Sequence, residues 1–413
     1  MSSTPSIKNE PWLNAPETRA VMDALTADGG EARFVGGCVR NAILGVSVED
    51  IDIATPAPPD EVTRRIEAAG LRAVATGIEH GTVTAISRSK PFEITTLRRD
   101  VSTDGRRATV AFSRDWEEDA QRRDFTMNAL YADVSGQVFD FVGGIADLRA
   151  GRVRFIGDPA KRIAEDYLRI LRLFRFHAYY GNGEIDADGL KAVAAAKGQI
   201  KTLSGERIQK EMLRLLAADG SVPVLRAMAA SGVLSEVLHG ALLFERFQKL
   251  CEADGDNFFT PDGLLRLGSL LSDAEQALEV ARRWRLSNDD RGRLVAMMTS
   301  PVKIVSYLSI REVRRALYRF GVERFKDLVR FRWAEDSKAS NGVQWRTLLA
   351  LADGWVRPAL PMTGGDVMAA GVPQGPLVGR VLGEVEEWWI DSDFTDDPLS
   401  LAERLKAVVQ ATI

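Results

Sequence analysis

The segment EDIDIAT, residues 49–55, places two carboxylates in an otherwise apolar run, with Asp50 and Asp52 separated by one isoleucine. β-Strands seldom carry two carboxylates on one side. Because residues i and i+2 of a strand point to the same face, the pattern predicts that the two side chains lie side by side. Such like charges repel and raise one pKa, and a hard divalent cation such as Mg²⁺ removes the conflict. Taken alone, the segment is equally compatible with a strand end bearing two solvated aspartates.

The chain around this segment has the pattern of a small α/β domain. Apolar runs separated by turns that contain Gly and Asp predict strands at 32–37, 50–55, 81–87, 91–97, 129–134 and 137–142. Two stretches with helical periodicity, 39–45 and 58–70, lie between them. We expect residues 1–15 to form a loose arm.

The pattern changes near residue 150 and becomes helical from about residue 155 nearly to the end. Apolar residues recur at three- and four-residue spacing through 163–180, 207–218 and 222–238. A Gly- and Pro-rich stretch, 356–376, predicts a break between helical blocks. The sequence therefore predicts an α+β fold class with four parts: an α/β head, a helical neck, a helical body and a helical tail, at 1–150, 151–220, 221–355 and 356–413.

Composition limits which residue types can carry the chemistry and indicates the cellular compartment. The 413 residues are 45% hydrophobic and 27% charged, which is typical of globular domains. We see no apolar run of the roughly 18–20 residues that a membrane span needs and no secretory signal. Two cysteines without metal-ligand spacing favour a reducing, cytoplasmic location, and three scattered histidines argue against a His-based metal site. The chemistry must therefore come mainly from Asp, Glu, Arg and Lys.

Charge is distributed unevenly along the chain. The net charge is −4, which by itself argues against a nucleic-acid partner. Residues 282–338, however, contain 15 Lys and Arg against 7 Asp and Glu, with aromatic residues interleaved. Such a stretch can contact a phosphate backbone, and the alternative is an amphipathic helical region with solvated basic faces.

Residues on either side of the carboxylate pair suggest a nucleotide site. Gly36 and Gly37 lie between a predicted strand and a predicted helix, where backbone N–H groups can approach a phosphate, and Arg40 on the first helical turn can reach a triphosphate. Glycines also simply form turns, so this signal is weak alone. Glu93 lies in another predicted strand that can bring it to the same metal, or leave it as an exposed strand residue.

A second candidate nucleotide-binding segment is DAQRRDFTMNAL, residues 119–130. Adjacent arginines suit polyphosphate recognition, and a nearby carboxylate can hold a ribose hydroxyl. The candidate residues are Arg122, Arg123, Asp124 and Asn128. The alternative is a helix cap with a surface ion pair.

Taken together, these motifs resemble a known family. GGCVRN with DIDIAT, then RRDFTMNAL, then GDPAKRIAEDYLRILRLFRF follow one another between about residues 32 and 215. They resemble the class II nucleotidyltransferases of the polymerase β superfamily, and within that group the tRNA nucleotidyltransferases, or CCA-adding enzymes. Bacterial poly(A) polymerase is the close relative. The resemblance implies a polymerase β-type nucleotidyltransferase head and template-independent addition of CCA to tRNA 3′ ends, with CTP and ATP as substrates.

The resemblance also implies roles for individual positions. Asp50 and Asp52 match the pair that binds two Mg²⁺ ions, and Glu93 matches a third acidic position. Gly36, Gly37 and Arg40 match the triphosphate-binding turn, and Arg123 and Asp124 match a ribose- and phosphate-contacting motif. Residues 100–121 match a flexible loop that helps in the switch from CTP to ATP. Segment 165–176 matches the motif whose Asp and Arg act as a template for the incoming base, and 204–216 matches a motif that braces the neck.

The template motif also makes physical sense on a helix. Asp166 and Arg169 have i,i+3 spacing, which predicts a shared face, and Arg172 and Arg175 continue it. The remaining residues of this segment are mostly apolar, so we expect the arginines to have polar partners. A carboxylate acceptor favours cytosine and adenine, which carry an amino donor where uracil and guanine carry an oxygen. The alternative is a helix surface with a local ion pair.

Other functions remain open from sequence alone. Asn41 stands where the family usually has Asp, and no appended phosphohydrolase domain is evident. The partners implied are CTP, ATP and the tRNA acceptor end held by the helical body and tail, with no membrane and no obligatory protein partner evident. The alternatives are a poly(A) polymerase, which the pI of about 5.7 disfavours, an enzyme that adds only CC or only A, or a noncatalytic RNA-binding protein.

Overall fold

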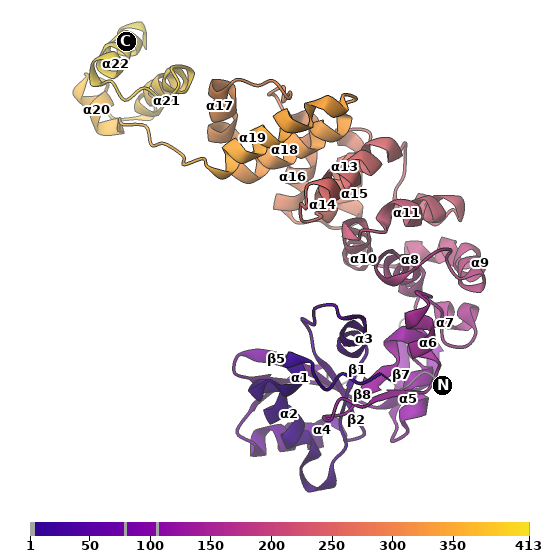
Figure 1. Ribbon diagram of the computed structural model, residues 1–413. Coiled ribbons are helices and arrows are strands. Elements are labelled where there is room, and N and C mark those ends of the chain that lie inside the picture. Colours follow the sequence, from indigo (N-terminus) through magenta and orange to yellow (C-terminus); the bar gives the residue numbers. More distant parts are fainter. Residues whose placement is uncertain (1–4, 78–80, 105–106, 413) are drawn as a thin grey trace. The chain divides into compact units, whose positions relative to one another are not determined.

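The computed structural model describes residues 5–77, 81–104 and 107–412 (Figure 1). The chain divides into two compact units, Met1–His239 and Gly240–Ile413. The first combines a mixed sheet with helices, and the second is built of helices, so the predicted α+β fold class is confirmed. The finer division at residues 150, 220 and 355 stays a prediction.

A seven-stranded mixed sheet forms the centre of the first unit. Its strand order is β3-β4-β5-β2-β1-β8-β9, and only β2 with β5 is parallel among these neighbours. All six predicted strand runs are confirmed, and β3 is an additional edge strand. The strands are β1 (Arg33–Val35), β2 (Asp52–Thr55), β3 (Arg72–Gly77), β4 (Thr82–Ser87), β5 (Lys90–Thr96), β8 (Leu130–Ala132) and β9 (Val138–Asp140).

The segment predicted to be a flexible loop contains regular structure. Strands β6 (Arg98–Asp104) and β7 (Arg107–Phe112) pair as a separate antiparallel hairpin. Helix α5 (Trp116–Gln121) follows, and the Asp115 side chain caps it by accepting a hydrogen bond from the Glu117 backbone N–H. The sequence missed these elements because polar residues dominate this segment, whereas its predicted role in nucleotide switching stays a prediction.

Helices cover both faces of the sheet. Helices α2 (Pro16–Thr26) and α4 (Pro59–Ala68) pack on strands β3 and β4, while α1 (Pro11–Asn14) places Trp12 edge-on against Phe34 at 5.0 Å. Helix α5 packs on the opposite face, where Trp116 and Ala120 join a core cluster with Val35. The expectation of a loose arm is wrong for residues 5–15, because apolar side chains such as Leu13 anchor this segment in the core.

The helices predicted for the neck are present in the first unit. The predicted helix over 163–180 is wrong in one respect, because it is two helices separated at Asp166, whose backbone is extended (φ −153°, ψ 107°). The Asp166 side chain accepts the Leu168 N–H, and such local bonds compete with helix continuation. The helices after the sheet are α6 (Gly144–Arg149), α7 (Pro159–Glu165), α8 (Leu168–Tyr180), α9 (Ala187–Ala196), α10 (Gly205–Ala217), α11 (Ser221–Ala230) and α12 (Leu234–Val237).

The second unit is an array of amphipathic helices around apolar clusters. One cluster includes Leu317, Phe325 and Trp345. Within the part of the chain that the structure describes, no helix is long and apolar enough to cross a membrane. The helices are α13 (Phe244–Asp256), α14 (Gly263–Leu270), α15 (Ala274–Arg283), α16 (Asn288–Thr299), α17 (Ile310–Phe320), α18 (Val322–Glu335), α19 (Gly342–Asp353), α20 (Gly364–Ala369), α21 (Pro376–Asp391) and α22 (Pro398–Thr412).

Much of the basic excess predicted at 282–338 is neutralised inside the second unit. Several of its arginines and lysines bind carboxylates that lie outside that stretch in the sequence. These pairs are Arg314–Asp393, Arg315–Asp391, Arg319–Glu387, Lys326–Asp353 and Arg330–Asp254. The local charge count therefore overstates the positive charge available to a nucleic acid.

Candidate active site

The sheet brings the three predicted acidic residues together at the interior strands β2 and β5, and we call this group of carboxylates the acidic edge. Asp52 is the first residue of β2 and lies opposite Glu93 in the parallel pairing with β5, so their side chains share a face. Asp50 lies in the irregular segment before β2, so the prediction that both aspartates lie in one strand is wrong. Asp50 still acts electrostatically on Asp52. Register between strands, rather than alternation within one strand, therefore assembles this site.

At the acidic edge, burial and negative charge together raise the pKa of Asp52. Burial raises the pKa of Asp52 to about 6, Glu93 and Asp50 add to this rise, and Arg123 opposes it. The pKa of one member of the pair is raised, as predicted, but burial and Glu93 contribute more to the rise than the predicted repulsion by Asp50. Over the described ranges, no ion pair involves any of these three carboxylates.

This donor set fits a hard divalent cation. It offers carboxylate oxygens, which Mg²⁺ prefers, and a cation would relieve the crowding that raises the pKa of Asp52. Among residues 5–77, 81–104 and 107–412, no three His, Cys, Asp or Glu side chains form a preassembled metal cage. Mg²⁺ commonly binds through one or two carboxylates plus waters and substrate phosphates, so two or three loosely grouped carboxylates are compatible with it.

The predicted glycine turn lies beside this edge. Gly36 has φ 72° and ψ −118°, a conformation that glycine adopts readily, and it precedes helix α3 (Gly37–Leu44). A Cβ on Gly36 would lie 3.8 Å from Nη1 of Arg123. Because Arg123 also acts on Asp52, the turn, the arginine and the acidic edge form one site.

Arg40, predicted to reach a triphosphate, is buried and bound to protein groups. Its guanidinium donates to the side-chain oxygens of Asn128 and Asn41, and Nη2 lies 2.8 Å from the hydroxyl oxygen of Tyr180. Burial lowers the pKa of Arg40, and none of these acceptors is a carboxylate. Asn41 thus supplies a neutral acceptor where the family usually has Asp. In this arrangement Arg40 fixes the glycine turn to the segment around Asn128.

The paired arginines share one buried carboxylate that sequence analysis missed. Asp119 accepts from Nε of Arg122 at 2.8 Å and from Nη2 of Arg123 at 3.0 Å, and the Tyr131 hydroxyl donates to it at 2.7 Å. Burial opposes ionisation of Asp119, but Arg123 and Arg122 outweigh it and lower its pKa to about 2. Arginines three and four residues after an Asp were the available signal, because this spacing permits pairing across one helical turn.

Asp124 joins the head to helix α8. It accepts from Nδ2 of Asn128 at 3.0 Å and from Nε of Arg172 at 2.8 Å. Burial opposes its ionisation, but Arg172 and these hydrogen bonds lower the pKa of Asp124 to about 2. The structure therefore brings together Arg40, Asn128, Asp124 and Arg172, which lie far apart in the sequence.

A second missed carboxylate extends this network into α10. Glu211 is buried and accepts from Nε of Arg175 at 2.5 Å, while Nη1 of Arg172 lies 3.8 Å from its Oε1. The expected polar partners for these arginines are thus Asp124 and Glu211. A Glu on the apolar face of the 207–218 pattern, between Ile208 and Met212, was the sequence signal.

The two residues of the predicted base template have different partners. Asp166 accepts from Nη2 of Arg207 at 2.7 Å. Arg169 donates to Glu165 at 2.5 Å, to the Arg162 carbonyl at 2.7 Å and to the Arg122 carbonyl at 3.2 Å. Because Asp166 precedes α8, the two are not on one continuous helical face. Sequence analysis missed Arg207, the arginine that directly contacts Asp166.

The fold and the site define the class of protein. A mixed sheet with grouped carboxylates beside a Gly-Gly turn is the head of a nucleotidyltransferase. The family model described as "Poly A polymerase head domain" matches residues 32–154. The model described as "Probable RNA and SrmB- binding site of polymerase A" matches residues 184–242.

Comparison with individual proteins identifies the family within this class. The chain is 30% identical over 393 residues to the CCA tRNA nucleotidyltransferase 1, mitochondrial, of Mus musculus, covering 94% of this chain and 89% of the relative. It is 33% identical over 388 residues to the CCA-adding enzyme of Streptococcus gordonii, covering 92% and 94%. The solved Bacillus stearothermophilus CCA-adding enzyme in complex with CTP matches with a TM-score of 0.71 and 25% identity over 96% of this chain and 98% of that chain. The chain belongs to the family of CCA-adding tRNA nucleotidyltransferases.

Proposed function

We propose that the chain adds CCA to tRNA 3′ ends without a nucleic-acid template, using CTP and ATP and releasing pyrophosphate. The observation that carries this proposal is the likeness to CCA-adding enzymes over nearly the whole chain, head and helical regions together. The grouped carboxylates, the glycine turn and the neck residues of this chain support the same activity.

The acidic edge is the proposed metal-binding centre. Asp50 and Asp52 would hold Mg²⁺, with Glu93 placed next to Asp52 by strand register. Two bound Mg²⁺ ions would supply Lewis-acid activation of the RNA 3′-hydroxyl and neutralise charge on the leaving pyrophosphate.

The glycine turn and the RRD segment are the proposed triphosphate and ribose site. The absence of side chains at Gly36 and Gly37 leaves backbone N–H groups near α3 accessible to phosphate oxygens. Arg123 lies beside this turn, held by Asp119, and would meet the triphosphate, with Arg122 adding positive charge. Arg40, Asp124 and Asn128 form the buried network beneath, so in this proposal they orient the turn, and their predicted contact with the nucleotide stays a prediction.

The neck is the proposed base-selecting element. The Asp166 carboxylate, oriented by Arg207, would accept the amino group of cytosine or adenine and reject the carbonyl of uracil or guanine. Arg169 is positioned by Glu165 and by the Arg122 carbonyl. Arg172 and Arg175 would complete the pocket wall through their bonds to Asp124 and Glu211.

The location and the RNA contacts are part of the same proposal. The second unit would hold the tRNA acceptor end through shape and phosphate contacts. The chain has only two cysteines, Cys38 and Cys251, which suits a reducing compartment, and we propose a cytoplasmic location. Cell fractionation with an antibody to the chain would test the location independently of activity.

One incubation series tests the proposed activity. Purified protein is incubated with tRNA lacking CCA, Mg²⁺ and each labelled NTP, alone and in pairs, and products are resolved at single-nucleotide resolution. Addition that needs both CTP and ATP and stops after three residues is expected. Long A tails would identify a poly(A) polymerase, and addition of only CC or only A would identify a partial enzyme. No addition by folded protein would contradict the proposal.

A further inference from the structure

A cavity opens on the same sheet face as Asp52. Arg33 of β1 lies opposite Ala54 of β2, and Ala54 is two residues from Asp52, so all three side chains point to one face. The cavity has a volume of about 630 Å³. Its walls include Arg33, Arg114, Trp116, Glu117, Phe139 and Phe141, none of which takes part in the site described above.

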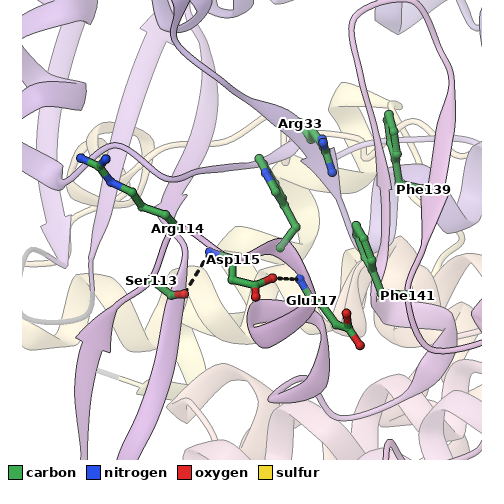
Figure 2. Close-up of a pocket in the computed structure, with 8 residues that line it drawn as sticks. Arg33, Ser113, Arg114, Asp115, Glu117, Phe139 and Phe141 are labelled. Carbon is green, nitrogen blue, oxygen red and sulfur yellow. Dashed lines mark hydrogen bonds between the residues drawn. The ribbon is translucent and has the colours of Figure 1, made fainter.

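Arg33 is held in this cavity by aromatic rings. Its guanidinium carbon lies 4.1 Å from the ring centroid of Trp116 and 4.1 Å from that of Phe139, and Figure 2 shows Arg33 beside Phe139. Nη1 is buried and has no hydrogen-bond acceptor among the described residues. Burial lowers the pKa of Arg33, whereas Glu31 and Asp133 act on it only through their charge. The stacked guanidinium therefore leaves one buried N–H group without a protein acceptor.

The rim of the cavity carries both signs of charge. Arg114 and Glu117 are exposed, and Asp115 is turned toward the start of α5, where it accepts the Glu117 N–H at 2.8 Å (Figure 2). Phe139 and Phe141 are half-buried and present apolar surface. Mixed charge disfavours a bare anion such as inorganic phosphate. It suits a ligand that combines an anionic group with a flat ring bearing N–H donors.

We propose that this cavity is a second nucleotide-binding subsite of the head, separate from the carboxylate edge. Arg33 and Arg114 take the phosphate, the Phe139 and Phe141 rings receive the base, and the Glu117 carboxylate accepts from an exocyclic amino group. Base–aromatic stacking tolerates any base and suits a nucleotide that is held rather than selected. The nucleotide comes either from the RNA substrate or from the free nucleotide pool.

The subsite is coupled to the acidic edge through packed side chains. Trp116 lies edge-on to Tyr131 with ring centroids 5.5 Å apart, and the Tyr131 hydroxyl donates to Asp119. Asp119 in turn holds Arg123, which acts on Asp52. A nucleotide seated against the aromatic wall is thus in a position to anchor RNA on the same face as the chemistry without entering the metal centre.

Direct binding measurements test the proposal. The variants are Arg114→Gln, Phe141→Leu and their combination, and the matched control is Arg72→Gln, an exposed arginine on edge strand β3. Filter binding with tRNA lacking CCA and equilibrium dialysis with labelled CMP report the two nucleotide sources separately. We expect the double variant to lose affinity on the order of tenfold for one of these ligands, with Arg72→Gln unchanged.

Each outcome decides the proposal. Loss for tRNA with CMP unchanged identifies an RNA nucleotide, and loss for CMP identifies a free nucleotide. Unchanged affinity for both ligands in a double variant with a wild-type unfolding midpoint would overturn the proposal, as would an equal loss in Arg72→Gln. Because these assays measure binding without turnover, they test the subsite separately from the proposed function. Failure of the wild-type protein to add CCA would contradict the proposed function but would not affect the result of the binding assays.

Discussion

The acidic edge of the head and the arginine-rich neck differ in how their charges are satisfied. At the edge, Asp50, Asp52 and Glu93 gather without an ion pair among the described residues, and burial raises the pKa of Asp52 to about 6. In the neck, Arg172 and Arg175 each bind a carboxylate of the same chain. The three carboxylates of the edge are therefore available to an external cation, whereas the charges of the neck hold its own geometry.

Substitutions at the acidic edge should therefore abolish nucleotide addition while leaving the fold intact. Asp52→Asn is expected to reduce nucleotide addition about a thousandfold or more, because a carboxylate that holds the metal is lost. The tRNA dissociation constant should stay within about twofold, because phosphate contacts elsewhere are unaffected. Asp60→Asn, an exposed change on α4, is the matched control. Near-normal turnover in Asp52→Asn would show that the edge is not the metal centre.

The neck should show the reverse behaviour, with a large effect on stability. Arg172→Met leaves the Asp124 carboxylate buried without its cation, and removing one partner of such a pair typically costs about 3 kcal/mol or more. Chemical denaturation of Arg172→Met, Asp124→Asn and the double variant would measure the coupling. A loss of unfolding free energy below about 1 kcal/mol in Arg172→Met would mean that the Arg172–Asp124 pair contributes little to the stability of the neck.

The contribution of the Asp119 carboxylate to stability should depend on pH. Its pKa is lowered to about 2 from the ordinary 3.8, so its stabilising contribution is complete above about pH 4 and lost as pH falls toward 2. The shift corresponds to on the order of 2 kcal/mol. The difference in unfolding free energy between wild type and Asp119→Asn should therefore shrink by this amount between pH 5 and pH 2. A difference independent of pH would place the ionised carboxylate outside the stabilising network.

A substitution at Arg207 should give the smallest effect of the four and would test whether the neck selects the base. Arg207→Lys keeps the charge but removes the planar guanidinium that orients Asp166. We expect preference for CTP over UTP to fall about tenfold with little change in the unfolding midpoint. Arg214→Lys, an exposed change on the same helix, is the control. Unchanged preference in Arg207→Lys would assign base selection to Arg169 without help from α10.

The sequence predicted the parts of this molecule that depend on local pattern. The six strand runs and the change to helices follow from alternation and periodicity, and the structure contains them. The grouping of Asp52 with Glu93 was implied by the family resemblance and depends on the register between β2 and β5. The direction of the pKa shift of Asp52 was also predicted, but its main cause is burial, to which repulsion by Glu93 and Asp50 adds.

Other features were missed by the sequence analysis. The break at Asp166 arises from a local side-chain bond to the Leu168 N–H that replaces helical continuation. Asp119 pairs with arginines three and four residues away, a spacing that the sequence already showed. Glu211, in contrast, gains its role only when the fold places Arg175 against it. For the same reason the basic stretch at 282–338 loses much of its free charge to carboxylates distant in sequence.

A metal titration tests the central claim most directly. Mn²⁺ binding to wild type, Asp50→Asn and Asp52→Asn is followed by electron paramagnetic resonance between pH 5 and pH 8, without nucleotide or RNA. Because a proton on Asp52 competes with the cation below its pKa of about 6, wild-type affinity should rise as pH increases through that value. Both variants should bind Mn²⁺ weakly at every pH, and affinity in Asp52→Asn equal to that of wild type would contradict the account.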